Sequence, residues 1–172
     1  MCLTAEALAE RLDEEINRAG RHDTPLSCLL LVVENLEELT RQHGGDLPEQ
    51  VFSYLAKTLG PELRRFDRIG RPSDSELLLL LPGADGPRGE MVARRVLDRL
   101  RAIKIEVEGV RRALQMSVGL ATWRTDVGAE DLLRQTRTAT WSVRADDTMP
   151  ELATTTALAT GSPPALGRPG PA

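Results

Sequence analysis

The stretch RRFDRIGRPSDSELLLLL, residues 64–81, decides the fold of this chain. Five consecutive leucines close it, and such a short apolar run is typical of a strand buried within a sheet. Residues 66–71 form a second extended segment, separated from residues 76–81 by the turn-forming sequence Pro72-Ser73-Asp74-Ser75. We therefore predict an antiparallel hairpin here.

The surrounding sequence alternates between helical and extended periodicity. Residues 26–33 are apolar except for Ser27 and rich in branched side chains, which favours a central strand covered on both faces. Thr4 can cap a first helix, and Gly20 is expected to end it. Further helices are predicted over residues 35–43, 48–59, 92–103 and 129–144, with a minor hairpin at 105–114 and a strand at 116–121. This order predicts an α+β sandwich, in which helices flank a central, mostly antiparallel sheet.

Composition argues against several classes of protein. Apolar residues make up 41% and charged residues 28%, with no uncharged apolar run of about eighteen residues, so we expect no membrane span. No basic segment precedes an apolar one at the N-terminus, so we expect no secretory signal and a cytoplasmic location. The formal charge of −4 argues against nucleic-acid binding, because neutralising phosphates needs clustered basic residues.

The chain offers few residues for a metal or a cofactor. Cys2 and Cys28 cannot by themselves form a disulfide framework or a four-ligand zinc site, and two histidines, His22 and His43, add little. Cys28 lies inside an apolar run, which indicates a buried small hydrophobe rather than a nucleophile. We expect neither a metal nor a cofactor.

The last residues differ in composition from the rest. Residues 150–172 contain repeated Pro and Gly, no aromatic residue and only two charged residues. Such a segment cannot bury enough apolar surface to offset the entropy lost on ordering. We predict one domain, residues 1–149, followed by a disordered tail, residues 150–172.

Four segments together resemble the GGDEF domain of diguanylate cyclases, which make cyclic di-GMP from two GTP molecules. Residues 64–77 are similar to the family's RxxDxxxRxGGDEF stretch, and residues 29–44 to its DxDxFKxxNDxxGH segment. Residues 116–121 resemble its VSIGVA strand, and residues 131–141 part of its ADxALYxAK helix. The resemblance covers about residues 7–145. It implies a nucleotidyl-cyclase-like, ferredoxin-like palm fold and a role in bacterial signal transduction.

The signature itself departs from the family pattern. Its two glycines, which let backbone amides approach GTP phosphates, are Ser73 and Asp74 here, so a negative charge faces the phosphate position. The third position, an acid in active cyclases, is Ser75. Glu76 is kept in the fourth position, and Leu77 replaces the phenylalanine as a core residue.

Other positions of the catalytic site have changed as well. The first metal-binding aspartate aligns with Val32, and the loss matters because Mg²⁺ requires oxygen ligands. The next acid falls on Glu34, which need not replace it because side chains alternate along a strand. The resemblance further aligns the guanine-recognising asparagine, its partner acid, the phosphate-binding lysine and a following arginine with Thr40, Glu49, Arg144 and Thr148. These losses imply a catalytically inactive domain.

A second site of the family, which binds the product, retains its residues. The resemblance places its RxxD motif on Arg64 and Asp67 and its helical arginine on Arg95. Guanidinium groups suit phosphate and guanine, and a carboxylate can accept from guanine N1 and N2. The hypothesis is therefore a cyclic di-GMP receptor that signals through an unidentified protein partner, with a homodimer left open.

The alternatives concern the same residues. RxxD also occurs at residues 71–74 and 95–98, so only its placement has meaning. Arg64 and Asp67 could instead form a surface ion pair that adds little stability, with Arg95 a solvated residue of a helix. The chain would then be a ligand-free interaction domain. A weak diguanylate cyclase is the third alternative.

Overall fold

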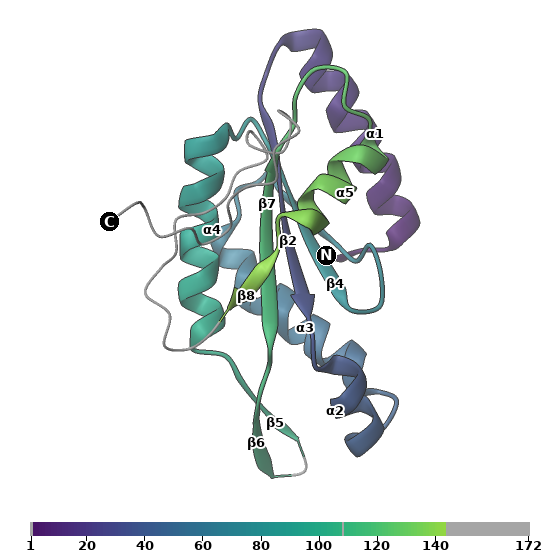
Figure 1. The fold of residues 1–172 in the computed structure, drawn as a ribbon, viewed down its shortest axis with the longest axis vertical. Coiled ribbons are helices and arrows are strands. Elements are labelled where there is room, and N and C mark those ends of the chain that lie inside the picture. The colour runs from purple at the N-terminus through teal and green to yellow at the C-terminus, as the bar shows by residue number, and fades with distance from the viewer. Residues whose placement is uncertain (1, 108, 144–172) are drawn as a thin grey trace, which may run out of the picture.

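The computed structural model describes residues 2–107 and 109–143 (Figure 1). Within these ranges six strands form one sheet in the order β1-β3-β4-β2-β7-β8, and two more form a separate hairpin. The strands are β1 (Cys2–Leu3), β2 (Leu26–Val33), β3 (Arg68–Gly70), β4 (Glu76–Pro82), β5 (Lys104–Val107), β6 (Val110–Ala113), β7 (Met116–Thr122) and β8 (Trp141–Val143). The helices are α1 (Ala5–His22), α2 (Leu36–His43), α3 (Leu47–Leu59), the 3-10 turn η1 (Gly60–Glu62), α4 (Gly86–Arg101) and α5 (Ala129–Thr138).

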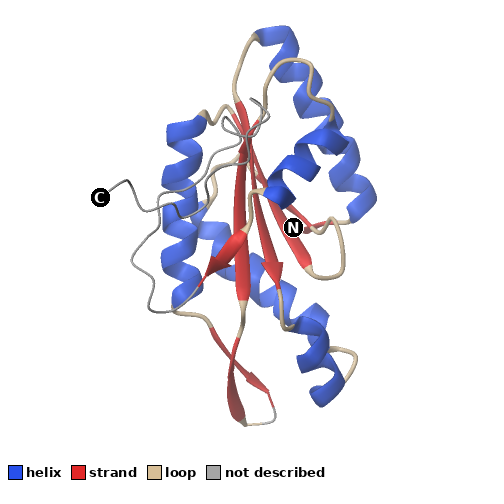
Figure 2. Cartoon of the chain, in the orientation of Figure 1, coloured by secondary structure: helices blue, strands red, loops and turns tan. Residues whose placement is uncertain are grey.

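The alternation of side chains along β2 divides the core into two clusters. Leu29 and Leu31 pack with residues of α2, α3 and α4, whereas Cys28 and Leu30 pack with residues of α1 and α5. All four are fully buried, and Figure 2 shows helices on both faces of the sheet. The prediction of a central strand covered on both faces is confirmed, as is the α+β fold with its mostly antiparallel sheet.

Both predicted hairpins are present. Strand β3 pairs antiparallel with β4, with Ile69 opposite Leu79, and β5 pairs with β6. Gly44 ends α2 with φ 110°, as expected of a helix stop. Cys28 is buried, and burial raises the pKa of its thiol to about 12, which agrees with a structural role.

The bounds of helices α1, α4 and α5 differ from the predicted ones. Helix α4 begins at Gly86, where the side chain of Asp85 accepts the N–H of Arg88, and it ends at Arg101 rather than at residue 103. Helix α1 continues past Gly20 to His22, because Asp23 adopts the left-handed conformation (φ 52°) and its N–H donates to the carbonyl of Ala19. Helix α5 ends at Thr138 rather than at residue 144. The hydroxyl of Thr140 donates to the carbonyl of Arg137, 2.9 Å away, and the chain then turns back as β8.

The short strands β1 and β8 were not predicted. β1 pairs parallel with β3, with Cys2 opposite Ile69, and β8 pairs antiparallel with β7.

None of the helices in the described ranges combines the length and apolarity needed to span a bilayer. The proposed tail, residues 150–172, lies outside the described residues and stays a prediction.

A close backbone approach holds α5 against the sheet. A Cβ atom at Gly119 in β7 would collide with the carbonyl oxygen of Thr136 and lie 2.8 Å from Cγ2 of Thr140. Thr136 itself is fully buried, and its hydroxyl donates to the carbonyl of Leu132 at 2.7 Å. Only glycine permits this contact between β7 and the end of α5.

We therefore expect Gly119→Ala to destabilise the fold by roughly 2–4 kcal/mol, because backbone atoms must move to accept the methyl group. Gly45→Ala is the matched control, since a Cβ there meets nothing within 4 Å, and its effect should stay within about 0.5 kcal/mol. Urea denaturation followed by circular dichroism measures both. Equal stability of the two variants would contradict the close-approach argument.

Candidate functional site

The turn between β3 and β4 carries the signature positions. Ser73 and Asp74 are exposed, whereas Leu77 is fully buried in the core, as predicted. Among the described non-glycine residues only Asp23 and Asp126 have a positive φ. This turn therefore adopts a backbone conformation that needs no glycine, which explains how it accommodates side chains at both glycine positions of the signature.

Arg71 connects this turn to α3. Its guanidinium lies over the ring of Phe52, 4.4 Å from the centroid, and Nη1 donates to Oε1 of Glu49 at 2.8 Å. Nη2 donates to the carbonyl of Asp74 at 3.3 Å. Glu49 is thus engaged by Arg71, and the hydroxyl of Thr40 is engaged within α2, where it donates to the carbonyl of Leu36 at 2.7 Å.

The retained acid of the signature, Glu76, is held by an arginine of α5. Nε of Arg137 donates to Oε2 and Nη2 donates to Oε1, each at 2.7 Å. The Glu76 side chain is 9% exposed and that of Arg137 is 45% exposed. This is a two-bond guanidinium–carboxylate pair, the strongest geometry for such an interaction.

The pair changes the proton affinity of both groups. Burial by itself raises the pKa of the Glu76 carboxyl, but hydrogen bonds from Arg137 and Ser73 and the charge of Arg137 together bring that pKa below its ordinary value. The hydrogen bond to Glu76 raises the pKa of Arg137. Both groups therefore stay charged at neutral pH.

The register of the sheet places the neighbours of Glu76. Val32 of β2 lies opposite Glu76 on one side and opposite Ser117 of β7 on the other. Directly opposite residues share one face of a sheet, here the face covered by α1 and α5. The hydroxyl of Ser117 donates to Oε1 of Glu34 at 2.7 Å, so Glu34 is engaged at the strand end.

The RxxD segment forms a tight turn before β3. Asp67 is buried, with its side chain 1% exposed, and Oδ2 accepts the backbone N–H of Arg64 at 2.7 Å. The guanidinium of Arg64 lies farther off, with Nε 3.8 Å from Oδ2, and its Nη2 donates to the carbonyl of Pro82 at 3.2 Å. Oδ1 of Asp67 is buried without a hydrogen-bond partner among the described residues. The ion pair of Arg64 and Asp67 therefore combines a half-exposed guanidinium with an enclosed carboxylate.

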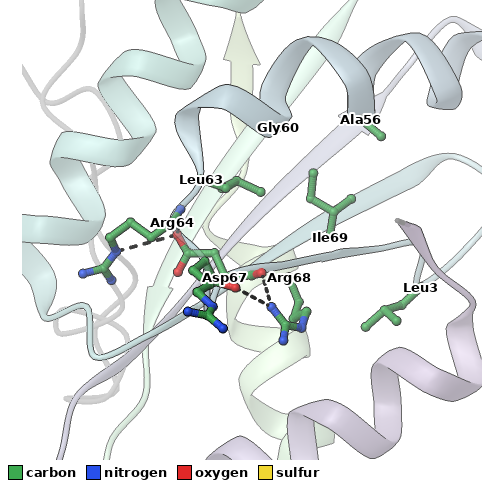
Figure 3. Close-up of a pocket in the computed structure, with 9 residues that line it drawn as sticks. Leu3, Ala56, Gly60, Leu63, Arg64, Asp67, Arg68 and Ile69 are labelled. Carbon is green, nitrogen blue, oxygen red and sulfur yellow. Dashed lines mark hydrogen bonds and ion pairs between the residues drawn. The ribbon is translucent and has the colours of Figure 1, made fainter.

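A pocket of about 500 Å³ opens at this turn (Figure 3). It is lined by β1, α3, η1 and β3 residues together with the turn: Leu3, Ala56, Gly60, Leu63, Arg64, Arg65, Asp67, Arg68 and Ile69. Three arginines thus surround one carboxylate. Leu3 also lines a second pocket of about 580 Å³ beside the signature turn.

Arg95 lies apart from this pocket. It is exposed on α4, and the described part of the chain contains no hydrogen bond or ion pair from it to Arg64 or Asp67. One helical turn further, Nε of Arg99 donates to Oε1 of Glu62 in η1 at 2.8 Å. This pair ties α4 to the segment that precedes the RxxD turn.

Comparison with known proteins decides the family. The profile described as diguanylate cyclase, GGDEF domain, matches residues 5–149. The chain belongs to the GGDEF domain family. The diguanylate cyclases DgcP of Pseudomonas aeruginosa and DosC of Escherichia coli K12 are 24% identical over 124 residues and 25% identical over 121 residues. These matches cover 72% and 70% of this chain but only 18% and 26% of the relatives, so the chain spans about a quarter of their length or less.

Solved GGDEF structures have the same fold. The diguanylate cyclase SiaD of P. aeruginosa, in complex with its activator SiaC, matches with a TM-score of 0.73 and 28% identity over 79% of this chain and 52% of that one. The GGDEF domain of DgcB from Caulobacter crescentus, in complex with c-di-GMP, matches with a TM-score of 0.72 and 14% identity over 80% of each chain.

The described residues of this GGDEF domain do not fit the divalent metal ion that the family implies. The Glu76 carboxylate is occupied at both oxygens by Arg137, and Val32 beside it offers no oxygen. No group of three or more His, Cys, Asp or Glu side chains that could hold a metal occurs in the described ranges. Arg144 and Thr148 lie outside those ranges.

Arg137 was missed at the level of sequence. Leu132 and Thr136 of α5 face the core, and Arg137 is the residue after Thr136. Arg134, one turn earlier, differs little in sequence context, yet it forms only an exposed pair with Asp131 at 2.6 Å. The buried Glu76 was the usable signal, because a buried carboxylate requires a cationic partner.

The lowered pKa of Glu76 predicts an acid-sensitive contribution to stability. A carboxyl whose pKa is lower in the folded state stabilises the fold above its unfolded value, and the gain is lost as pH falls through the folded value. Wild type should therefore lose more stability than Glu76→Gln between about pH 5 and pH 3. At pH 7 the substitution should cost about 1 kcal/mol, since Arg137 can rehydrate.

Urea denaturation at pH 7, 5 and 3 measures this difference. Asp131→Asn, which alters an exposed pair of the same helix, is the control and should follow wild type. Parallel pH profiles of wild type and Glu76→Gln would contradict the prediction.

Proposed function

We propose that this GGDEF domain is a receptor for cyclic di-GMP without diguanylate cyclase activity. Arg64 and Asp67 contact the ligand, and Arg95 provides a third contact from α4. The observation that carries the proposal is the buried Asp67 carboxylate, whose Oδ1 has no partner among the described residues and which lines a pocket with three arginines.

The chemistry of the pocket suits a guanine nucleotide without a metal. Oδ2 of Asp67 is already engaged by the backbone of Arg64, which leaves Oδ1 as the acceptor for guanine N1 or N2. Because Oδ1 is buried, the ligand reaches it when the side chains that cover it move aside. Arg64 and Arg65 are exposed and can donate to phosphate or to the O6/N7 edge. Arg68 donates to the carbonyls of Arg65 and Asp67, both at 2.9 Å, and so maintains the turn.

The position of Arg95 follows from its helix. Residues 95 and 99 are one turn apart and share a side of α4. Because Arg99 is paired with Glu62 of η1, that side of α4 faces the segment leading into Arg64. A ligand larger than one nucleotide would extend from the pocket toward Arg95.

Inactivity is supported by the changes at the catalytic positions. Phosphoryl transfer depends on positioning and on cationic stabilisation of the phosphates. Here Asp74 adds an anion at the turn, Val32 removes a ligand, and Glu76 is bound to Arg137. The proposed receptor is cytoplasmic and acts through a protein partner.

A ligand-free docking domain is the second candidate. Phe66, between the RxxD residues, has 69% of its surface exposed, and Met91 on α4 has 58% exposed. Exposed apolar side chains of this size are common at protein interfaces. The relative SiaD, solved with its activator, is an example of a cyclase that binds a protein.

Purified protein should not convert GTP to cyclic di-GMP with Mg²⁺ or Mn²⁺. The physical reason is the absence of a carboxylate set able to hold the metal among the described residues. Chromatography of a long incubation measures product. Product formation that disappears in Glu76→Ala would establish cyclase activity instead.

Cyclic di-GMP should bind wild type, and Arg64→Ala should weaken binding by about tenfold to a hundredfold, because a charge-assisted hydrogen bond is lost. Asp67→Asn keeps an oxygen for the turn but loses the charge, and should relax the preference for cyclic di-GMP over cyclic di-AMP. Arg95→Ala should also weaken binding. Isothermal titration calorimetry measures each constant.

Arg94→Ala is the matched control, because Arg94 is exposed on the same helix beside Arg95. Its binding constant should lie within about twofold of wild type. No heat with wild type at high micromolar ligand, or equal binding by all variants, would exclude the receptor and favour the docking domain.

A further inference from the structure

The carboxylate of Glu76 is buried, and the neighbouring strand residue Val32 offers it no positive charge. Glu76 begins β4, its side chain is 9% exposed, and its strand neighbour on the same face is the apolar Val32. A carboxylate in such a place needs an opposite charge and hydrogen bonds, because burial without them costs several kcal/mol.

The solution comes from α5. Arg137 occupies both carboxylate oxygens with two 2.7 Å bonds. The guanidinium approaches from the face covered by α1 and α5, the same face on which Val32 and Ser117 lie. Its fork geometry leaves neither oxygen of the carboxylate without a hydrogen bond.

We propose that Arg137 is a built-in cation, which takes the place of a divalent metal ion at Glu76. The positive charge that balances Glu76 belongs to a side chain of α5, so the carboxylate needs no metal ion. Arg137 is a positioning residue: through Glu76 it joins α5 to the start of β4 and to the signature turn. The proposal does not depend on cyclic di-GMP binding, and its test uses no nucleotide.

The first part of the test concerns stability. Arg137→Ala should lower the melting temperature by at least about 3 °C, because it leaves a buried charge unpaired. Arg134→Ala, which removes an exposed arginine one turn earlier on the same helix, should change it by no more than about 1 °C. Millimolar Mn²⁺ should not shift the melting temperature of wild type.

The second part asks whether Arg137 excludes a metal. Val32→Asp places a second carboxylate directly opposite Glu76, within reach of one cation. With Arg137 present, this variant should show no response to Mn²⁺. In the double variant Val32→Asp, Arg137→Ala, two adjacent carboxylates lack a cation, and Mn²⁺ should raise the melting temperature.

If the double variant is unfolded without metal, the expected response is a gain of helical circular dichroism on adding Mn²⁺. The proposal fails if the double variant does not respond to Mn²⁺, or if Val32→Asp alone responds equally. It also fails if Arg137→Ala is as stable as wild type, or if wild type gains stability from Mn²⁺ through Glu76.

Discussion

The register in which β2 pairs with β4 is the constraint on which the rest of the structure depends. Both strands are buried on both faces, so each side chain has only one face on which it fits. A shift of one residue in their register would move Glu76 from the face of α5 to the face of α3 and α4. The apolar core therefore positions the charged site, although it contributes no polar atom to it.

Three carboxylates among the described residues differ in how their oxygens are engaged. At Glu76 both oxygens are engaged, and at Glu49 one oxygen is bound by an arginine that also stacks on an aromatic ring. At Asp67 only one oxygen is engaged, and the other is buried. Satisfied carboxylates hold elements together, whereas an unsatisfied buried oxygen is a place where a ligand can gain hydrogen bonds.

Local patterns predicted the hairpin and the central strand because both are written in consecutive residues. The leucines of residues 77–81 and the apolar run of residues 26–33 specify burial without any distant partner. The end of α5 was not predictable in this way, since β8 is set by backbone pairing with β7 and by the room that Gly119 leaves. β1 has two residues, too few for any periodicity.

The candidate site likewise has parts that consecutive residues predict and parts that depend on packing between distant segments. The signature positions and the RxxD motif are contiguous in sequence, and their placement before an apolar strand could be recognised. The partner of Glu76 lies 61 residues away, on a helix with a similar arginine one turn earlier, and only the packing of α5 selects between them. The inward turn of Asp67 likewise depends on a backbone N–H, which no side-chain pattern encodes.

Leu3 of the edge strand β1 lies between the two pockets. It lines the pocket at Asp67 and also the one beside Ser73 and Asp74, so one side chain is a wall common to both. Its carbonyl accepts the N–H of Arg71 at 3.0 Å, the residue that braces the signature turn. A displacement of β1 would therefore change the shape of both pockets. A ligand in either pocket would contact Leu3 and so hold β1 more firmly against the sheet.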